Sequence, residues 1–187
     1  MRRRFAAAIG TSALLLATLA LVLSAAAPPA LARNLRGKTA PAAAMSDRAA
    51  IEALESSYVE AFDTRDVDGI MKVYARGKQL FVFDVVPPRE YPSWDDYKRD
   101  WETLFSQFPG PASDKMSEMS ITVVGTVAYG HHIEDSVFTQ KDGTKKEFVV
   151  RVTDVYRKLK DKWLIVQEHV SFPVDVTTGQ ADLMSKP

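Results

Sequence analysis

Three side chains have the types and surroundings needed for acid–base chemistry: Tyr58, Asp84 and Asp154. Asp154 lies in the stretch FVVRVTDVYRKL, where it shares one strand face with Val152 and Tyr156. Because alternate strand residues point to the same side, we expect its carboxyl group on an apolar face, where the ionised form is costly to bury. Burial raises the pKa of such an acid and makes it a neutral hydrogen-bond donor that can bind an oxyanion.

Each of the three also has a purely structural interpretation. Asp154 could pair with an arginine or a backbone N–H group, even at a dimer interface. Tyr58 lies on the buried stripe of a helix and could be a core tyrosine whose hydroxyl bonds to the backbone. Asp84 alternates with Leu80 and Val82 and could cap the turn after its strand. A general base, by contrast, must be ionised close to the substrate, with a pKa tuned toward the working pH.

Aromatic residues could complete a pocket around these groups. Trp101 and Phe105 belong to a wide apolar stripe at helical spacing, which could line the mouth of a cavity or form plain core. Tyr156 shares the strand face of Asp154 and is expected beside it. We therefore count Trp101, Phe105 and Tyr156 as pocket-lining candidates.

Glu168 and His169 are alternative neighbours of Asp154, depending on strand pairing. A two-residue turn at Lys160–Asp161 places Asp154 opposite Gln167 and diagonal to His169, whereas a three-residue turn with a bulge places it opposite Val166 and diagonal to Glu168. The even-numbered residues around Glu168 are the more uniformly apolar, which favours Glu168 pointing inward. Both residues stay on the list of pocket-lining candidates.

A metal site is not expected. His131 and His132 are adjacent in a predicted strand, so they face opposite ways and cannot bind one ion together. The chain has only three histidines and no cysteine, which excludes thiolate sites, disulfides and thiol catalysis. The sequence also has no Gly-rich phosphate loop and no G-x-S-x-G motif, and we expect no cofactor.

The sequence predicts three helices in its first part and mostly strands after them. Apolar spacing predicts a helix from Ser46, a short helix after DTRD and a third helix after Ser93. Between the last two, QLFVFDVV predicts a strand that ends at Pro87–Pro88. Four more strands are expected at roughly 115–125, 126–140, 145–159 and 162–173. This order predicts an α+β fold, with three N-terminal helices packed in the concave face of a curved, mostly antiparallel sheet, a cone-shaped barrel with a pocket inside.

The first 45 residues are typical of export. A basic start, an apolar run from about Phe5 to Ala27 and the small-x-small site Ala30–Leu31–Ala32 predict a signal peptide over 1–32, cleaved after Ala32. A retained anchor is the alternative, because the run is nearly long enough to span a bilayer; the Arg-Arg-Arg-Phe start fits either the general or the twin-arginine route. We expect a linker at 33–45, one domain at 46–176 and an unordered tail at 177–187. The location would be periplasmic or secreted.

Charge limits the class of partner. The chain has 24 basic and 24 acidic side chains, and loss of Arg2, Arg3 and Arg4 with the signal leaves a net charge near −3. Such a balance favours neither nucleic acid nor, after cleavage, an anionic membrane surface. The outward sheet face is expected to carry Trp163, Ile165, Val149 and Val155, and a homodimer would cover it.

The sequence resembles the ketosteroid-isomerase-like and SnoaL-like branch of the nuclear transport factor 2-like superfamily. The resemblance rests on YVEAFDTRDVDGIMKVYA, on the strand ending at Asp84 and on DVYRKLKDKWLIVQEHVSFP, and it spans residues 46–176. It implies that Tyr58 and Asp154 hold a developing enolate oxygen while Asp84 carries the proton. Asp84 matches only with two residues inserted before it, and it lacks the proline that follows this aspartate in the family.

The expected function is therefore an exported domain that binds a small apolar or carbonyl-bearing molecule. If it is an enzyme, the resemblance implies a cofactor-independent isomerase or related enzyme that abstracts a proton next to a carbonyl. The alternative is a ligand-binding or dimeric assembly module that has the same fold without the chemistry.

Overall fold

The computed structural model describes residues 45–185. The predicted signal peptide and nearly all of the predicted linker therefore lie outside the described residues. The elements in chain order are α1 (Asp47–Thr64), α2 (Val67–Ile70), the 3-10 turn η1 (Gly77–Gln79), β1 (Phe81–Phe83), α3 (Trp94–Gln107), β2 (Ala112–Val124), β3 (Val127–Thr139), β4 (Lys145–Leu159) and β5 (Lys162–Ser171). No helix within 45–185 has both the length and the apolar character needed to cross a membrane.

Helix α1 begins and ends at well-defined caps. The hydroxyl of Ser46 accepts a hydrogen bond from the amide of Ala49 at its start, which satisfies one of the free N–H groups there. At its end Arg65 adopts a left-handed conformation with φ of 59°. Ile51, Tyr58 and Phe62 are buried along one side, which confirms the predicted apolar stripe.

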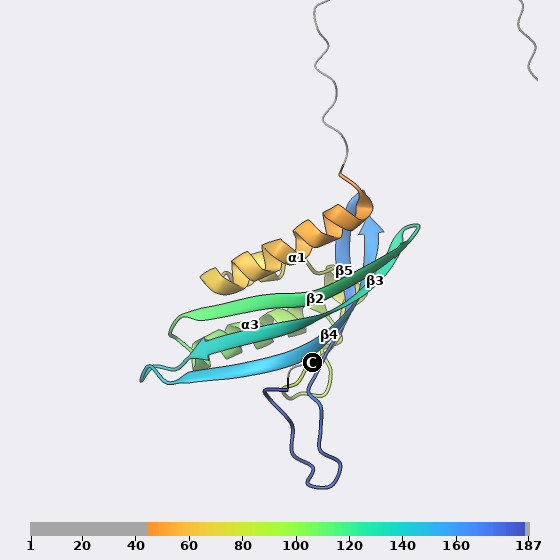
Figure 1. Cartoon of the computed structure of the whole chain (residues 1–187). Helices are drawn as coiled ribbons and strands as arrows, with labels where there is room; N and C mark the ends of the chain where they lie inside the picture. Colours follow the sequence, from red (N-terminus) through yellow and green to blue (C-terminus); the bar gives the residue numbers. More distant parts are fainter. Residues whose placement is uncertain (1–44, 186–187) are drawn as a thin grey trace, which may run out of the picture. The chain divides into compact units, whose positions relative to one another are not determined.

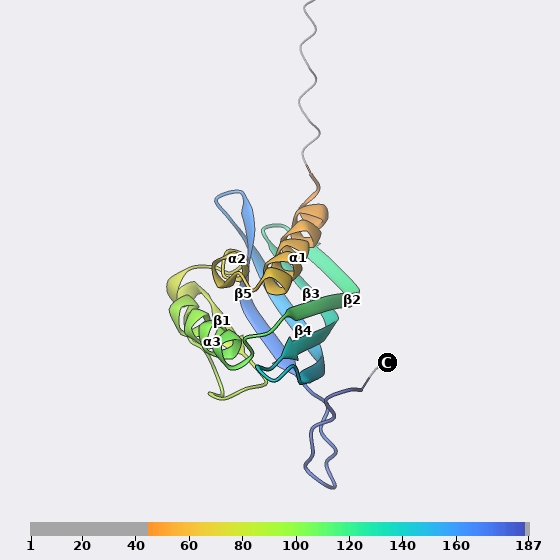
Figure 2. The same ribbon diagram turned by 90° about the vertical axis from the view of Figure 1, so that its left-hand side faces the viewer.

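The strands form one curved sheet in the order β1-β5-β4-β3-β2. Neighbours are antiparallel except β1, which pairs with β5 in parallel. The helices lie on the concave side of this sheet, with α1 running across it and α3 below (Figures 1 and 2). The predicted α+β architecture is confirmed, and the sheet is open rather than closed into a barrel.

A bulge in β5 decides which of its side chains face the helices. The turn at Lys160–Asp161 has two residues, both with positive φ, as two-residue hairpin turns require. Tyr156 pairs with Ile165 and Asp154 with Glu168, so β5 has one residue more than β4 over this interval. An extra residue inverts the alternation of faces. Glu168 thus points inward and lies directly opposite Asp154, a register that differs from both of the predicted ones.

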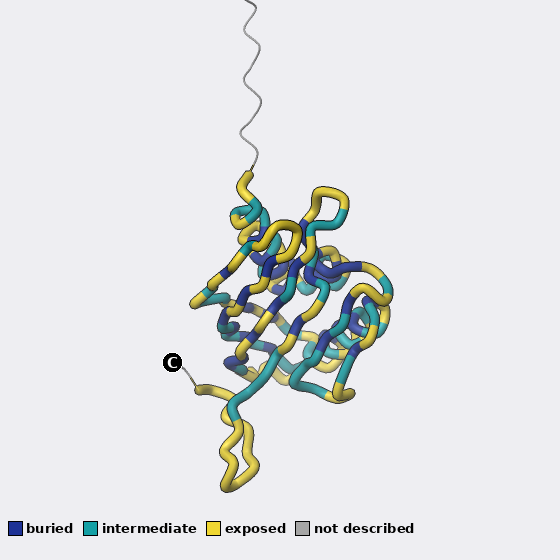
Figure 3. The backbone as a smooth tube through the Cα atoms, turned by 90° about the vertical axis from the view of Figure 1, so that its right-hand side faces the viewer, coloured by how far each residue is buried: buried dark blue, intermediate teal, exposed yellow. Residues whose placement is uncertain are grey.

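The two-residue turn before the bulge corrects the expectation for the outward face, because it pairs Ile165 with the buried Tyr156. Trp163 and Ile165 are buried with exposures of 4% and 1%, and the indole N–H of Trp163 donates to Asp47 on α1. They belong to the inner core and not to a dimer surface. Burial alternates along the strands, with buried and exposed residues following one another (Figure 3).

The segment after β5 is more structured than the sequence suggested. Val174 forms an antiparallel bridge with Ala181, and the amide of Val149 on β4 donates to the carbonyl of Leu183. The segment extends away from the sheet (Figure 1) and its side chains from Asp175 to Ser185 are exposed. Backbone hydrogen bonds order it without an apolar core of its own.

Arg65 ties the end of α1 to the end of α3. Its guanidinium donates to the carbonyl of Phe105 at 2.6 Å and to the carbonyls of Phe108 and Gly110. Phe105 lies in the last turn of α3, and Phe108 and Gly110 follow its end, where the last C=O groups of a helix lack helical partners. One side chain therefore holds the two helix ends that border the cavity described below.

We expect Arg65→Ala to lower the free energy of unfolding by about 2–3 kcal/mol, because it leaves these carbonyls without their charged donor. Urea unfolding of the full chain measures the change. Arg89→Ala is the matched control: its ion pair with Glu90 is 85% exposed on the arginine side, so the loss should stay below about 0.5 kcal/mol. Equal losses in the two variants would contradict the role given to Arg65.

Candidate functional site

A cavity of about 300 Å³ lies between the sheet and the helices α1 and α3. Most of its wall is aromatic or aliphatic, as is usual for small-molecule sites. The apolar lining residues include Phe62, Trp101, Leu104, Phe108, Phe138, Phe148, Val150, Val152, Val170 and Phe172. The cavity therefore has the size and surface of a site for a small, mostly apolar molecule.

Acidic groups interrupt the apolar wall. Asp84, Glu134 and Glu168 line the cavity together with the phenol groups of Tyr58 and Tyr97. None of the lining residues is a lysine, arginine or histidine. A bound molecule would meet these carboxyl and hydroxyl groups, together with the amide of Gln107 and the indole N–H of Trp101, as polar contacts.

Asp84 follows the last residue of β1 and lies in the cavity wall. One carboxylate oxygen accepts the amide N–H of Val85 at 2.5 Å. Burial raises the pKa of Asp84 to about 6, an effect that the hydrogen bond from Val85 only partly offsets. This carboxyl group is therefore largely ionised at neutral pH yet close to its titration range, as a general base requires.

Glu168 is held by two tyrosines from outside the sheet. Tyr74 and Tyr97 each donate a hydroxyl hydrogen bond to it, to different oxygens, at 2.7 Å. Burial raises the pKa of Glu168 to about 8, while these two hydrogen bonds act in the opposite direction. The helix α3 and the segment before β1 thereby fix this carboxyl group at the cavity wall.

Asp154 is buried, as predicted, but it does not line the cavity. Its exposure is 0%, and desolvation together with the neighbouring Glu168 raises its pKa well above the ordinary value. The hydroxyl of Tyr156 donates to it at 3.3 Å. Asp154 therefore lies one layer behind the wall to which Tyr58 and Asp84 belong.

The other predicted pocket residues separate into two groups. Trp101 and Glu168 line the cavity with Tyr58 and Asp84. Phe105 is buried core that packs on Phe62 and Trp101, and Tyr156 is fully buried beside Asp154. His169 is exposed on the opposite face of β5, where its ring contacts Phe83, so the structure places it outside the pocket.

Glu134 and Glu55 were missed in the sequence, and His132 was considered there only together with His131, as a metal-binding pair that was rejected. Glu134 lines the cavity, and His132 and Glu55 are buried next to Asp154. The alternation of β3 already places His132 and Glu134 on the face of Phe138, and Glu55 follows Ile51 by one helical turn on the buried stripe. These spacings could have revealed all three, but apolar positions dominated the pattern.

We expect Tyr97→Phe and Tyr74→Phe each to lower the free energy of unfolding by about 1–2 kcal/mol, because each leaves a buried oxygen of Glu168 without its donor. Since both act on one carboxyl group, their effects should not add, and a double-mutant cycle measures this coupling. Tyr129→Phe changes an exposed tyrosine and should alter stability by less than about 0.5 kcal/mol. Strict additivity of the two variants would argue against a shared acceptor.

Comparison with known proteins agrees with this geometry. An NTF2-like protein of unknown function from Pseudomonas putida KT2440 is 25% identical and superposes with a TM-score of 0.67, covering 77% of this chain and 100% of that one. An NTF2-like superfamily protein from Salmonella enterica serovar Typhimurium is 18% identical, with a TM-score of 0.61 over 71% of this chain and 94% of that one.

A proposed dehydratase of the NTF2-like family from Streptomyces avermitilis is 15% identical, with a TM-score of 0.56 over 65% of this chain and 92% of that one. At this identity the likeness shows the fold alone. No significant match was found among curated proteins. Residues 51–175 match the SnoaL-like domain, and the chain therefore belongs to the SnoaL-like family, with the nuclear transport factor 2-like fold.

Proposed function

We propose that the domain binds a small apolar molecule bearing a carbonyl group and moves a proton next to that carbonyl. The observation that carries the proposal is the composition of the cavity wall. Apolar side chains surround about 300 Å³, and Asp84 and Tyr58 are both among the lining residues. A flat hydrophobic body would fill such a space, and its polar end would lie against these two groups.

Asp84 is the proton carrier in this proposal. Its ionised carboxylate takes a proton from the carbon next to the carbonyl, and the electron pair moves onto the carbonyl oxygen as an enolate. Asp84 then returns the proton to the same or to another carbon of the enolate system, which regenerates the carboxylate. The oxidation state of the molecule is unchanged overall, so the step is balanced without a redox partner.

Tyr58 is the donor to the developing enolate oxygen. Burial and the nearby Glu134 raise the pKa of Tyr58 well above its usual range, so its hydroxyl keeps the proton. A neutral donor aimed at developing negative charge in a dry site stabilises the transition state more than the ground state.

The proposal is tested with 2-tetralone, a bicyclic ketone whose protons next to the carbonyl exchange with solvent. The full chain in heavy water should accelerate deuterium uptake at that carbon, measured by proton NMR. Asp84→Asn should reduce the enzyme-dependent rate by at least about a hundredfold, the usual contribution of a general base, while binding, followed by quenching of Trp101 fluorescence, stays within a few-fold.

Asp114→Asn is the matched control for this experiment. Asp114 is also a buried acid on the inner sheet face, on β2, but it does not line the cavity, so exchange should be unaffected. Tetralin, the hydrocarbon without the oxygen, should bind more weakly than the ketone. Binding of the ketone without any exchange would overturn the catalytic part and leave a ligand-binding domain.

The exchange rate should also follow the titration of Asp84. Its pKa of about 6 is raised by burial and by Asp100 and lowered by the Val85 amide and the Tyr97 hydroxyl. Since only the ionised form accepts a proton, the rate per bound ketone should rise with pH through about 6 and level off above about 7. An inflection near 3.8, the pKa of an ordinary aspartate, would mean that the catalytic carboxyl group is exposed to water and is not this one.

A further inference from the structure

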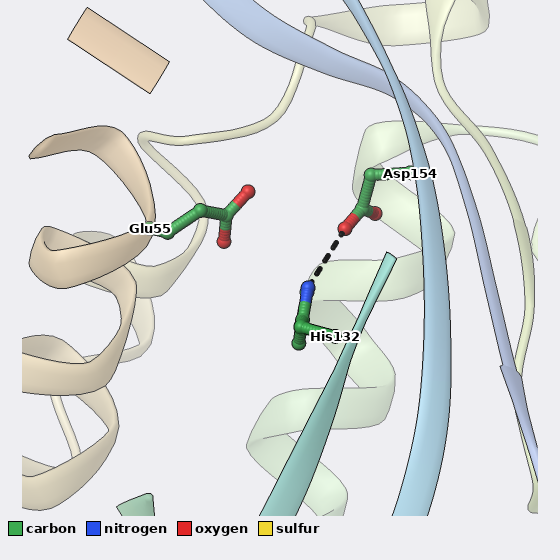
Figure 4. Close-up of side chains that lie close together, drawn as sticks. All are labelled: Glu55, His132 and Asp154. Atoms are coloured by element: carbon green, nitrogen blue, oxygen red, sulfur yellow. Dashed lines mark ion pairs between the residues drawn. The ribbon is translucent and has the colours of Figure 1, made fainter. Parts of the chain in front are cut away.

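A second polar cluster lies behind the cavity. Glu55 extends from α1 toward His132 on β3 and Asp154 on β4, so three separate elements meet at this point (Figure 4). One donor atom from each residue lies within 4.8 Å of the other two. None of the three is among the residues that line the cavity, so this cluster is distinct from the proposed ligand site.

All three side chains are buried and incompletely satisfied. Their residues are exposed by only 2% for Glu55, 3% for His132 and 0% for Asp154. Glu55 Oε1, His132 Nδ1 and Asp154 Oδ1 each lack a hydrogen-bond partner among the described residues. Buried polar atoms without partners are rare and costly, and here three of them occur in one cluster.

The orientation of His132 is fixed from its far side. Its Nε2 lies 3.0 Å from Glu134 Oε1, and in the tautomer that carries its proton on Nε2 the ring donates this N–H to the Glu134 carboxyl group. The Nδ1 lone pair then points toward Asp154. A carboxylate that accepts the second ring N–H is the usual outer partner of a metal-binding histidine, because it sets the tautomer and raises the basicity of the ligating nitrogen.

The spacing of the donors suits a bound ion better than a direct hydrogen bond. His132 Nδ1 and Asp154 Oδ2 are 3.7 Å apart, which is too long for a hydrogen bond. Two bonds of about 2.1 Å that meet at roughly 120° would separate their donors by about 3.6 Å. Since the three donor atoms lie within 4.8 Å of one another, a shift of the Glu55 carboxyl group by roughly an ångström would complete the set.

The balance of charge among the buried side chains also favours a bound cation. The buried polar residues include five carboxyl groups, those of Glu55, Asp114, Glu134, Asp154 and Glu168, but no lysine or arginine within the described part of the chain. His132 is the one basic side chain among them. A cation in the cluster would neutralise two of these acids where they lie closest to the imidazole.

From these observations we infer that Glu55, His132 and Asp154 bind a divalent first-row transition-metal ion such as zinc or manganese. Two carboxylate oxygens and one imidazole nitrogen form a mixed oxygen and nitrogen donor set that suits these ions. The hydroxyl of Tyr156, which donates to Asp154 Oδ2, acts with Glu134 as an outer partner. Bound in this position, the ion would link α1 to β3 and β4.

The inference does not depend on the ligand of the cavity or on its chemistry. Glu134 lines the cavity and also contacts His132, and Glu168 lines the cavity and pairs with Asp154, so these two side chains connect the two sites. A metal ion would hold the sheet and α1 at fixed spacing, and the cavity wall would be stabilised with them.

The test is the binding of zinc to the metal-free full chain. Competition with a chromophoric zinc chelator should show one ion per chain, and added zinc should raise the unfolding temperature, since an ion that binds only the folded state stabilises it. Excess EDTA should reverse that rise. Cobalt(II) in place of zinc gives visible absorption bands that report directly on imidazole and carboxylate ligation.

Single substitutions identify the ligands. Glu55→Gln, His132→Gln and Asp154→Asn should each weaken zinc binding by at least tenfold and remove the cobalt bands, while Glu134→Gln should weaken it by about 10-fold to 100-fold through its outer position. Asp114→Asn removes another buried acid of the same face that is not among the proposed ligands, and should weaken binding much less than the three ligand variants. His131→Gln removes an exposed histidine and serves as the control for surface binding.

Two results would overturn the inference. One is the absence of stoichiometric zinc, manganese or cobalt binding by the unaltered full chain, with no EDTA-reversible change in unfolding temperature; protons alone would then satisfy the cluster. The other is binding that persists in the three ligand variants and is lost in His131→Gln, which would assign the ion to the surface. The EDTA-reversible shift uses the unaltered chain, so its absence overturns the inference even if a variant fails to fold.

Discussion

Removing carboxyl groups from water is the most costly feature of this fold, and the concave face of the sheet is organised around it. Each of four buried acids has a specific partner: Glu168 has the hydroxyls of Tyr74 and Tyr97, Asp114 has Ser136, Asp154 has Tyr156 and Glu134 has His132. Most of these donors are neutral hydroxyl groups. They stabilise the acids without adding a buried base. The pKa values of these acids therefore remain raised by burial.

The bulge in β5 is the local feature that makes this arrangement possible. It lets Trp163 and Ile165 pack inward next to α1 while Glu168, further along the same strand, also points inward. A regular strand would send one of these sets to the outer face, because side chains alternate with a period of two. One inserted residue therefore places a carboxyl group beside both the cavity and Asp154.

The inner face of the sheet has two parts that differ in their side chains. Toward Phe138, Phe148 and Phe172 it is aromatic and open enough for a cavity, whereas around Glu55, His132 and Asp154 it is polar and closed. Glu134 lies at the boundary between them. The division gives the two proposed activities of the domain, binding a small apolar molecule and binding an ion, different positions in one core.

The sequence by itself determined the order of elements, the apolar stripes of α1 and α3, the α+β class and the burial of Tyr58 and Asp154, since these depend on local periodicity. It did not determine the register of β4 against β5, the inward position of Trp163 or the convergence of Glu55 with His132. Glu55 is 77 positions from His132 and 99 from Asp154, and their convergence depends on the packing of α1 against the sheet. The register of β4 against β5 depends on the bulge. Only the tertiary structure therefore decided that Asp154 lies behind the cavity and that His169 lies outside it.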